Sequence, residues 1–255
     1  MILTDTHCHL YSEEFLGDID AVIQRATDVG VSKFYLPGID SASISAMIDL
    51  ENRYPGKCIA MTGLHPCYVK ENYLEELEIV GDWLTKRKFA AIGEIGLDYY
   101  WDKTYVAEQT AAFRIQIEWS IKYGLPIVIH TRNAMQETVN IVKEYTSRGA
   151  TGIFHCFSGS YETAVEIIKA GFYLGIGGVL TYKNAGLAEV LSKIDLIHMV
   201  LETDAPYLTP VPFRGKRNES SYLQYIATKL AVVKNCSIEE VAEITSANAQ
   251  KIFVL

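Results

Sequence analysis

The sequence contains no apolar run near the roughly 20 residues that a helix needs to cross a membrane, and no cationic segment followed by an apolar one opens it. It is also poor in cysteine. The five cysteines are odd in number, widely scattered and include no Cys-x-x-Cys pair, which argues against a disulfide framework and favours reduced thiols. We therefore expect a soluble, cytoplasmic protein with no membrane partner.

Positive charge is in deficit as well. The chain has 23 Lys and Arg against 31 Asp and Glu, a formal net charge of −8, and this argues against bulk, non-specific attraction to nucleic acid. A nucleic-acid substrate is still compatible, because a local basic rim or bound divalent cations can invert the potential at a cleft. No low-complexity segment, charged tail or linker divides the chain. We expect one domain over residues 1–255.

Short β-branched or apolar runs alternate with longer amphipathic stretches, a pattern typical of strands alternating with helices. Strands are predicted at 2–6, 33–36, 58–62, 90–93, 127–129, 152–154, 173–176 and 199–202. Helices are predicted at 18–29, 41–53, 72–87, 105–122, 134–147, 161–170 and 185–193, and, after the eighth strand, at 221–234, 238–244 and 247–252. Ser237 resembles the start of a capping box, and Gly30, Gly149 and Gly171 stand where helices should end.

Eight strands, each followed by a helix, predict an α/β fold of the (β/α)8 TIM-barrel type. A doubly wound sheet is the alternative. It is less favoured because no Gly-x-Gly-x-x-Gly turn follows the first strand.

His7 and His9 follow the first apolar run directly. Side chains at i and i+2 of a strand point to the same side, so both imidazoles can converge on one metal ion while Cys8 faces away. Neutral imidazoles bind Zn, Mn, Co, Ni or Fe. The alternative is a pair of histidines with no ligand role.

The other predicted strands end in polar residues too, and five of the six histidines lie at such ends, His198 being the exception. In a barrel the active-site groups lie at the C-terminal ends of the strands. Strands end where polar residues begin in any protein. That explanation accounts poorly for three apolar runs that each stop at a histidine or carboxylate, since half-buried ionisable groups need partners and a shared cation supplies one. We therefore predict a metal centre.

Six candidate ligands result: His7, His9, Glu94, His130, His155 and Asp204. One ion with an open position uses about three protein ligands, so six suit two ions roughly 3.5–4 Å apart. Glu94 is the natural bridge, because Gly93 and Gly96 leave space around it. Asp204 is the best candidate for the general base that takes a proton from a metal-activated water.

Other residues are predicted to face the substrate. His65 is assigned to a phosphate oxygen or the leaving group, with a His-Pro turn as the alternative. Arg132 can hold a phosphate with a bidentate fork. Arg214 lies in a basic cluster with Lys216 and Arg217, for which a solvated loop or pairing with Glu219 or Glu202 is the alternative.

Three further assignments concern neighbours of these residues. Glu202 is expected to orient a ligand histidine rather than to bind metal. The run Tyr99-Tyr100-Trp101 could stack on a base or pack on the barrel rim. Cys8 and Cys156, each beside a ligand histidine, are expected to be core residues.

The sequence resembles the TatD family of metal-dependent deoxyribonucleases, within the amidohydrolase-like, metallo-dependent hydrolase group of barrels. The resemblance covers nearly the whole chain and rests on the runs DTHCHL at 5–10, GLHP at 63–66, GEIGLDY at 93–99, HCFSG at 155–159, ETDAPYL at 202–208 and PFRGKRNE at 212–219. Three residues depart from the usual pattern: Thr131, Asn133 and Ala205, where Ser, Asp and Ser are common.

The resemblance implies that His7, His9 and Asp204 hold one divalent ion and His130 and His155 the other, with Glu94 between them. It implies hydrolysis of DNA phosphodiesters, often as a 3′-5′ exonuclease, with Mg, Mn or Zn and with single strands or 3′ ends as substrate. Two rivals remain: hydrolysis of a small ester, amide or phosphoester, and a metal-binding scaffold without activity. No obligate protein partner is evident.

Overall fold

The computed structural model describes residues 1–254; residue 255, the last of the expected domain 1–255, lies outside the described residues. Eight strands follow one another along the chain: β1 Leu3–Asp5, β2 Val31–Leu36, β3 Cys58–Ala60, β4 Ile92–Asp98, β5 Ile127–Arg132, β6 Gly152–Phe154, β7 Phe172–Ile176 and β8 Met199–Leu201. The helices are α1 Ile19–Asp28, α2 Ile44–Arg53, α3 Tyr73–Lys86, α4 Val106–Tyr123, α5 Met135–Thr146, α6 Tyr161–Lys169, α7 Leu187–Ser192, α8 Leu223–Lys234 and α9 Ile238–Ile252.

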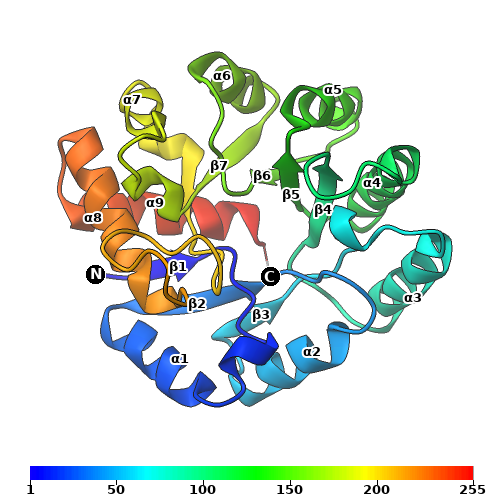
Figure 1. Ribbon diagram of the computed structural model, residues 1–255, viewed down its shortest axis with the longest axis horizontal. Coiled ribbons are helices and arrows are strands. Elements are labelled where there is room, and N and C mark those ends of the chain that lie inside the picture. Colours follow the sequence, from blue (N-terminus) through cyan, green and yellow to red (C-terminus); the bar gives the residue numbers. More distant parts are fainter. Residues whose placement is uncertain (255) are drawn as a thin grey trace.

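All strand pairs are parallel and form two sheets, β1-β2-β3 and β4-β5-β6-β7-β8. Backbone hydrogen bonds join the sheets at both seams. Gly93 N donates to Thr62 O (2.8 Å) between the third and fourth strands, and Thr6 N donates to Leu201 O (3.0 Å) between β8 and β1. The ring therefore closes, with the helices outside it (Figure 1). This confirms the predicted (β/α)8 barrel.

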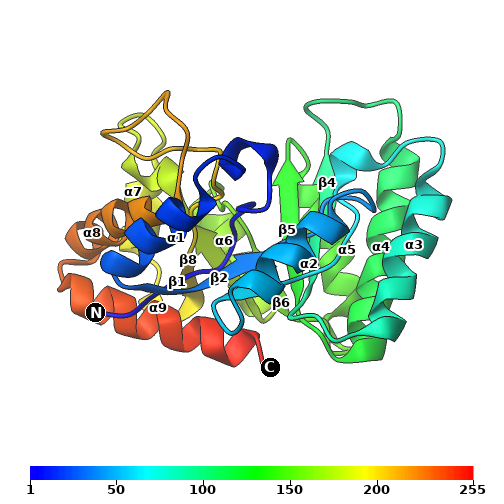
Figure 2. The ribbon, with the colours of Figure 1, turned by 90° about the horizontal axis from the view of Figure 1, so that it is seen from below.

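Side chains alternate between the two faces of the barrel wall. Ile127 and Ile129 of β5 pack outward in the main hydrophobic core, while Val128 between them belongs to a separate cluster inside the barrel. Helix α9 lies across the N-terminal ends of the strands, and the loops that follow the strands lie at the opposite end (Figure 2). The Phe253 ring, just after α9, stacks on Tyr35 at 4.0 Å and closes this end.

Most predicted elements agree with the structure to within three residues. The expected ends are also confirmed: Ser237 accepts a hydrogen bond from Glu240 N (3.1 Å), and Gly30, Gly149 and Gly171 have φ of 97°, 96° and 86°. Those left-handed conformations suit glycine because it has no Cβ.

The bounds of one predicted strand and the division of the last helix into two were wrong. The strand at 90–93 is β4, Ile92–Asp98, so Glu94 lies inside the strand rather than after it. The helices at 238–244 and 247–252 are one helix, α9. The polar residues between them are compatible with a helix because the Thr245 hydroxyl donates to Val241 O (2.7 Å) and the Ser246 hydroxyl to Ile2 O (3.1 Å).

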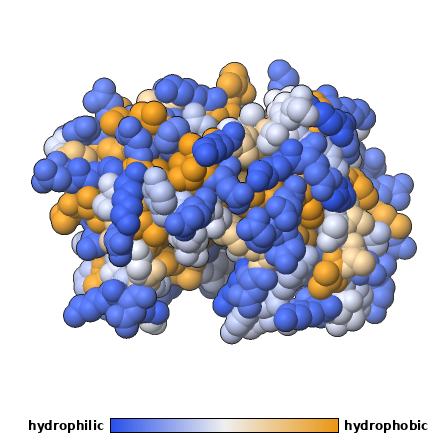
Figure 3. Space-filling view, turned by 90° about the horizontal axis from the view of Figure 1, so that it is seen from above, coloured by the Kyte–Doolittle hydropathy of each residue, from blue (hydrophilic) through white to orange (hydrophobic). Residues whose placement is uncertain are grey.

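Among residues 1–254, no helix combines the length and the apolar character that a membrane crossing requires. On the face shown in Figure 3, hydrophilic residues predominate and hydrophobic ones are scattered between them.

Candidate metal centre

On three strands, the inward-facing side chains change from apolar to ionisable over two residues. On β5, apolar Val128 is followed by His130; after β6, Ile153 is followed by His155. At β8 the same step leads from Val200 to the buried Glu202. Strand parity thus delivers ionisable groups to the C-terminal mouth of the barrel, above an apolar interior.

Glu94 reaches the same place by a different route. The register of β4 against β5 shifts between Gly93, opposite Val128, and Ile95, opposite Ile129. Glu94 is therefore an extra residue in the ladder, and its N–H donates to Gly38 O (2.9 Å) instead. Such a bulge re-aims a side chain, and here the carboxylate, 3 % exposed, points into the centre.

Five imidazoles gather around the Glu94 carboxylate. Oε1 lies near three ring nitrogens: His130 Nδ1 (2.9 Å), His155 Nε2 (3.0 Å) and His65 Nε2 (3.4 Å). Oε2 lies near two: His7 Nε2 (3.1 Å) and His9 Nε2 (3.5 Å). Asp204 Oδ1 completes the group, 3.6 Å from His7 Nε2 and 3.5 Å from His9 Nε2. All six predicted ligands therefore lie together.

The outer nitrogens of His9 and His130 form hydrogen bonds that orient the rings, and that of His155 faces a carboxylate without forming a hydrogen bond. Tyr11 donates its hydroxyl proton to Pro37 O (2.6 Å), so its oxygen accepts from His9 Nδ1 (3.2 Å). His130 Nε2 donates to Asp98 Oδ2 (2.9 Å), and His155 Nδ1 lies 3.4 Å from Glu202 Oε1. With a proton on each outer nitrogen, the inner nitrogen directs a lone pair at the centre, as a metal ligand requires.

His65 has the opposite arrangement. Its Nδ1 accepts a hydrogen bond from Cys67 N (3.1 Å), so in the neutral ring the proton is on Nε2, the nitrogen that faces Glu94. Burial lowers the pKa of His65, which favours the neutral ring. His65 therefore presents an N–H donor where the other histidines present lone pairs.

The donor set fits divalent cations. Five ring nitrogens lie within 3.5 Å of one carboxylate, which offers only about four lone-pair positions. His7 Nε2 and His9 Nε2 are 3.3 Å apart, and His7 Nδ1 is buried without a hydrogen-bond partner among the described residues. Three groups have ligand atoms within 4.8 Å of one another: His7, His155 and Asp204; His7, His9 and Glu94; His65, Glu94 and His130. A mixture of imidazole and carboxylate accepts several metals.

Burial and neighbouring charges act in opposite directions on the pKa values of the cluster. Burial alone would raise the pKa of Glu94, but His155, His65 and His7 hold it well below its usual range. Burial lowers the pKa of a histidine, yet hydrogen bonds to Asp204 and Glu94 raise that of His9 to about 9. Both carboxylates are thus ionised, and cations that bind there must displace protons from the histidines.

The backbone around the mouth is strained. Asn133, Cys156, Asp204 and Leu208 have φ of 52°, 48°, 57° and 50°, in the left-handed region that costs most residues roughly 1–2 kcal/mol. Asp204 keeps this conformation with its N–H donating to His7 O (2.9 Å). Strain of this kind concentrates at functional sites.

Both Cys8 and Cys156 were expected to be core residues, and the structure confirms this for Cys8 only. Cys8 is fully buried and its thiol lies 3.6 Å from Tyr35 O, in the core. Cys156 was expected there too, but it is only partly buried and lines the cavity described below. Strand parity fails for it because β6 ends at Phe154 and the chain then turns through a left-handed residue.

A cavity of about 580 Å³ opens above the cluster, between two groups of loops at the mouth. Its floor includes Glu94, His130 and Asp204. Tyr207 and Leu208, which follow β8, also line it, as do Tyr68, Trp101 and Arg132 from the segments at the ends of β3, β4 and β5. In Figure 2 these loops stand at the top of the molecule, opposite α9.

The two arginines predicted to bind substrate share an arrangement. The Arg132 guanidinium lies 3.8 Å from the Tyr100 ring centre, and that of Arg214 lies 3.9 Å from the Tyr182 ring centre. Neither forms an ion pair with a carboxylate within residues 1–254, whereas each of the other six arginines does. Arg132 lines the cavity; Arg214 does not.

The remaining basic residues of the predicted cluster differ from Arg214. Arg217 forms an ion pair with Asp18 (2.7 Å) rather than with Glu219 or Glu202, and Glu219 pairs with Arg25 (2.6 Å). Lys216 lies 5.9 Å from the Phe213 ring centre. Arg217 thus has a structural partner.

Sequence reasoning missed two buried carboxylates. Asp98 accepts from His130 and from the backbone N–H groups of Tyr100 (2.8 Å) and Trp101 (3.0 Å). Asp5 accepts from the hydroxyls of Thr203 and Ser220, both at 2.6 Å, and so ties β1 to the segment that carries Asp204. Both stand inside the recognised motifs, but nothing in their spacing distinguishes a supporting carboxylate from a loop residue.

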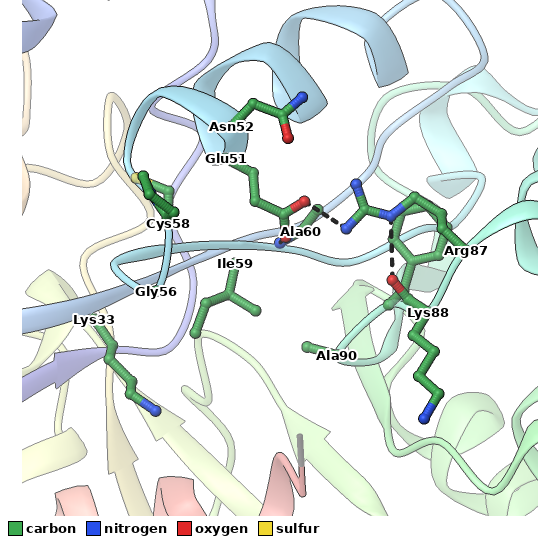
Figure 4. Close-up of a pocket in the computed structure, with 12 residues that line it drawn as sticks. Lys33, Glu51, Asn52, Gly56, Cys58, Ile59, Ala60, Arg87, Lys88 and Ala90 are labelled. Carbon is green, nitrogen blue, oxygen red and sulfur yellow. Dashed lines mark hydrogen bonds and ion pairs between the residues drawn. The ribbon is translucent and has the colours of Figure 1, made fainter.

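A second cavity, of about 390 Å³, lies beside β3 and contains none of the predicted site residues. The ion pair of Glu51 and Arg87 spans its wall, and Lys33 and Lys88 lie on opposite sides of it (Figure 4). It has no cluster of ligand atoms among the described residues, so the metal chemistry belongs to the mouth.

Comparison with known proteins agrees with this geometry. Residues 4–254 match the family model described as TatD related DNase. An uncharacterized metal-dependent hydrolase of Bacillus subtilis, YabD, is 41% identical over 253 residues, which are 99% of each chain. The 3′-5′ ssDNA/RNA exonuclease TatD of Erwinia tasmaniensis is 29% identical over 98% of this chain and 99% of its own.

A solved structure is similar throughout. The crystal structure of YjjV, a TatD homologue from Escherichia coli, superposes with a TM-score of 0.94 at 29% identity, covering 99% of this chain and 98% of that one. The barrel and the loops at its mouth therefore follow an arrangement that has been determined experimentally in a relative.

Proposed function

This chain belongs to the family of TatD-related DNases and is a metal-dependent hydrolase, and from that premise we propose that it hydrolyses phosphodiester bonds of DNA, acting as a 3′-5′ exonuclease on single-stranded ends. The observation that carries the proposal is the cluster of five imidazoles around the Glu94 carboxylate, which lies with Asp204 at the floor of an open cavity. The named exonuclease among its relatives supports the choice of substrate.

The proposed ligands are His7, His9 and Asp204 for one divalent ion and His130 and His155 for the other, with Glu94 between them. Bound there, Mg, Mn or Zn ions would lower the pKa of water and neutralise the charge that builds up on the phosphate. The inward lone pairs of His9, His130 and His155 support this set.

Asp204 is proposed as the general base. Its carboxylate is 9 % exposed, lines the cavity and is held in the ionised form, since His9 lowers its pKa against the effect of burial. It can therefore accept the proton of the attacking water. His65 is proposed as the donor to a phosphate oxygen or the leaving oxygen, because its N–H faces the centre.

Glu202 and the two stacked arginines have supporting roles in the proposal. Glu202 orients His155 and also accepts a hydrogen bond from Cys156 N. Arg132 binds a substrate phosphate at the cavity wall, and Arg214 does so from the neighbouring loop. A guanidinium without a carboxylate partner is free to form a bidentate pair with phosphate.

The test uses end-labelled single- and double-stranded oligonucleotides, with the metal-free protein supplied with Mg, Mn or Zn. We expect a ladder that shortens from the 3′ end of the single strand, and no products in excess chelator. Turnover of a panel of small esters and amides without cleavage of any oligonucleotide would overturn the proposal.

We infer as well that residues 1–255 act as one domain, because the proposed ligands come from β1 to β8 of a single barrel. The scattered free cysteines support a cytoplasmic location.

A further inference from the structure

The loop after β4 places an exposed tryptophan on the wall of the catalytic cavity. Trp101 is 67 % exposed and lines the cavity, while its neighbour Tyr100 lies behind it with the ring centres 4.9 Å apart and nearly perpendicular. The contacts of the indole within this chain are the Tyr100 ring and the Arg132 guanidinium. The exposed remainder of the ring, on the cavity wall, is available to a ligand.

This loop is held rigidly. The Asp98 carboxylate accepts from the N–H groups of Tyr100 and Trp101, and its other oxygen accepts from His130. Further along, Lys70 pairs with Asp102 at 2.9 Å, which pins the far side. A ligand that meets Trp101 meets a preorganised surface, so little entropy is lost on binding.

Basic side chains around the cavity are few. Of the residues within 1–254 that line it, Arg132 is the only lysine or arginine, and its guanidinium lies 3.8 Å from the Tyr100 ring centre and 5.1 Å from that of Trp101. Proteins that track a duplex neutralise many phosphates. A single guanidinium beside an exposed indole suits one phosphate next to one unpaired base instead.

We propose that Trp101 is a stacking platform for a nucleobase of the substrate and that Arg132 holds the phosphate beside that base. The inference rests on the proposed nuclease function and deepens it: Trp101 determines specificity by requiring an unstacked base near the cleaved bond. Asp98 is the positioning residue that fixes this platform relative to His130.

The experiment combines a variant with altered substrates. Single-stranded oligonucleotides carry one abasic residue at successive positions from the 3′ end, and kcat/KM is measured for wild type, Trp101→Ala and Trp101→Phe. On the intact oligonucleotide, Trp101→Ala should reduce kcat/KM about 10-fold or more, given what stacking on an aromatic contributes. Trp101→Phe should recover most of it. At one abasic position, wild type and Trp101→Ala should become equal.

Two further measurements separate stacking from a structural role. 2-Aminopurine at that position should be quenched on binding to wild type and not to Trp101→Ala. Tyr161→Ala is the matched control, because Tyr161 is 39 % exposed but does not line the cavity; it should behave as wild type throughout.

The outcomes are distinct. An equal loss for Trp101→Ala on every substrate, abasic or intact, would overturn the stacking role alone. No loss at all would do the same. If wild type cleaves no oligonucleotide, the proposed nuclease function fails and this inference fails with it.

Discussion

The two ends of the barrel use the same strands for opposite purposes. At the N-terminal end, the inward positions are apolar, among them Tyr35, Val128 and Val200, and Phe253 closes them off. At the C-terminal end, the next inward position on the same strands is His130 or Glu202. One end is packed with apolar side chains, and the other holds charged groups on a backbone with four left-handed non-glycine residues. Folding free energy and chemistry are therefore separated along the barrel axis.

The largest expected effect comes from the mouth. Glu94→Gln removes the charge that five imidazoles share, so we expect a loss of at least about 10³-fold in kcat on an oligonucleotide and reduced metal content. Steady-state kinetics and elemental analysis measure both. Glu51→Gln, the same change beside the other cavity (Figure 4), should retain activity. If Glu94→Gln kept more than a tenth of wild-type activity, the assignment of the chemistry to the C-terminal end of the barrel would be contradicted.

The next effect comes from the closed end. Phe253→Ala removes a ring that is 3 % exposed and should lower the free energy of unfolding by about 3 kcal/mol, because it leaves a cavity against Tyr35. Metal content and the rate at low temperature should not change. Denaturant unfolding gives the stability; Val254→Ala, at a residue 82 % exposed, is the control. A loss of rate without a loss of stability would show that the two ends are coupled.

The smallest expected effect comes from the ion pair between Arg25 in α1 and Glu219. Burial would raise the pKa of Glu219, but the hydrogen bonds from Arg25 hold it below its usual range. A depressed carboxylate pKa adds stability above the unfolded value of about 4.3, and this is lost as the pH falls through the folded pKa. Arg25→Met should therefore lower stability by up to about 1 kcal/mol at pH 7, and the difference should shrink as the pH falls below about 4.3 and through the lower pKa of the folded Glu219.

Thermal unfolding of wild type and of Arg25→Met from pH 7 to pH 3 measures this difference in stability. Arg148→Met, which breaks an exposed pair with Glu118 (2.6 Å), should have a smaller effect. A difference in stability between wild type and Arg25→Met that grows as the pH falls would contradict the predicted pH dependence.

The sequence predicted the barrel and brought the six proposed ligands to one end of it, and the reason is periodicity. His130 and His155 follow apolar residues by two positions, and a period of two needs no tertiary information. Glu94 could not be placed by that rule, because the register shift that turns it inward arises from the pairing of β4 with β5. The single helix α9 was also missed, since the carbonyl that Ser246 contacts belongs to Ile2, at the other end of the chain.

By itself the sequence determined that His130 and His155 face the mouth, since alternation along a strand is a local property. Only the tertiary structure decided what each histidine offers there. His9 and His130 present lone pairs because Tyr11 and Asp98 accept hydrogen bonds from their outer nitrogens, and the outer nitrogen of His155 faces the Glu202 carboxylate at 3.4 Å. His65 presents a proton because Cys67 N donates to its other nitrogen. A ring tautomer depends on the partner that folding brings to its far side, and two of those four partners, Asp98 and Glu202, are distant in sequence.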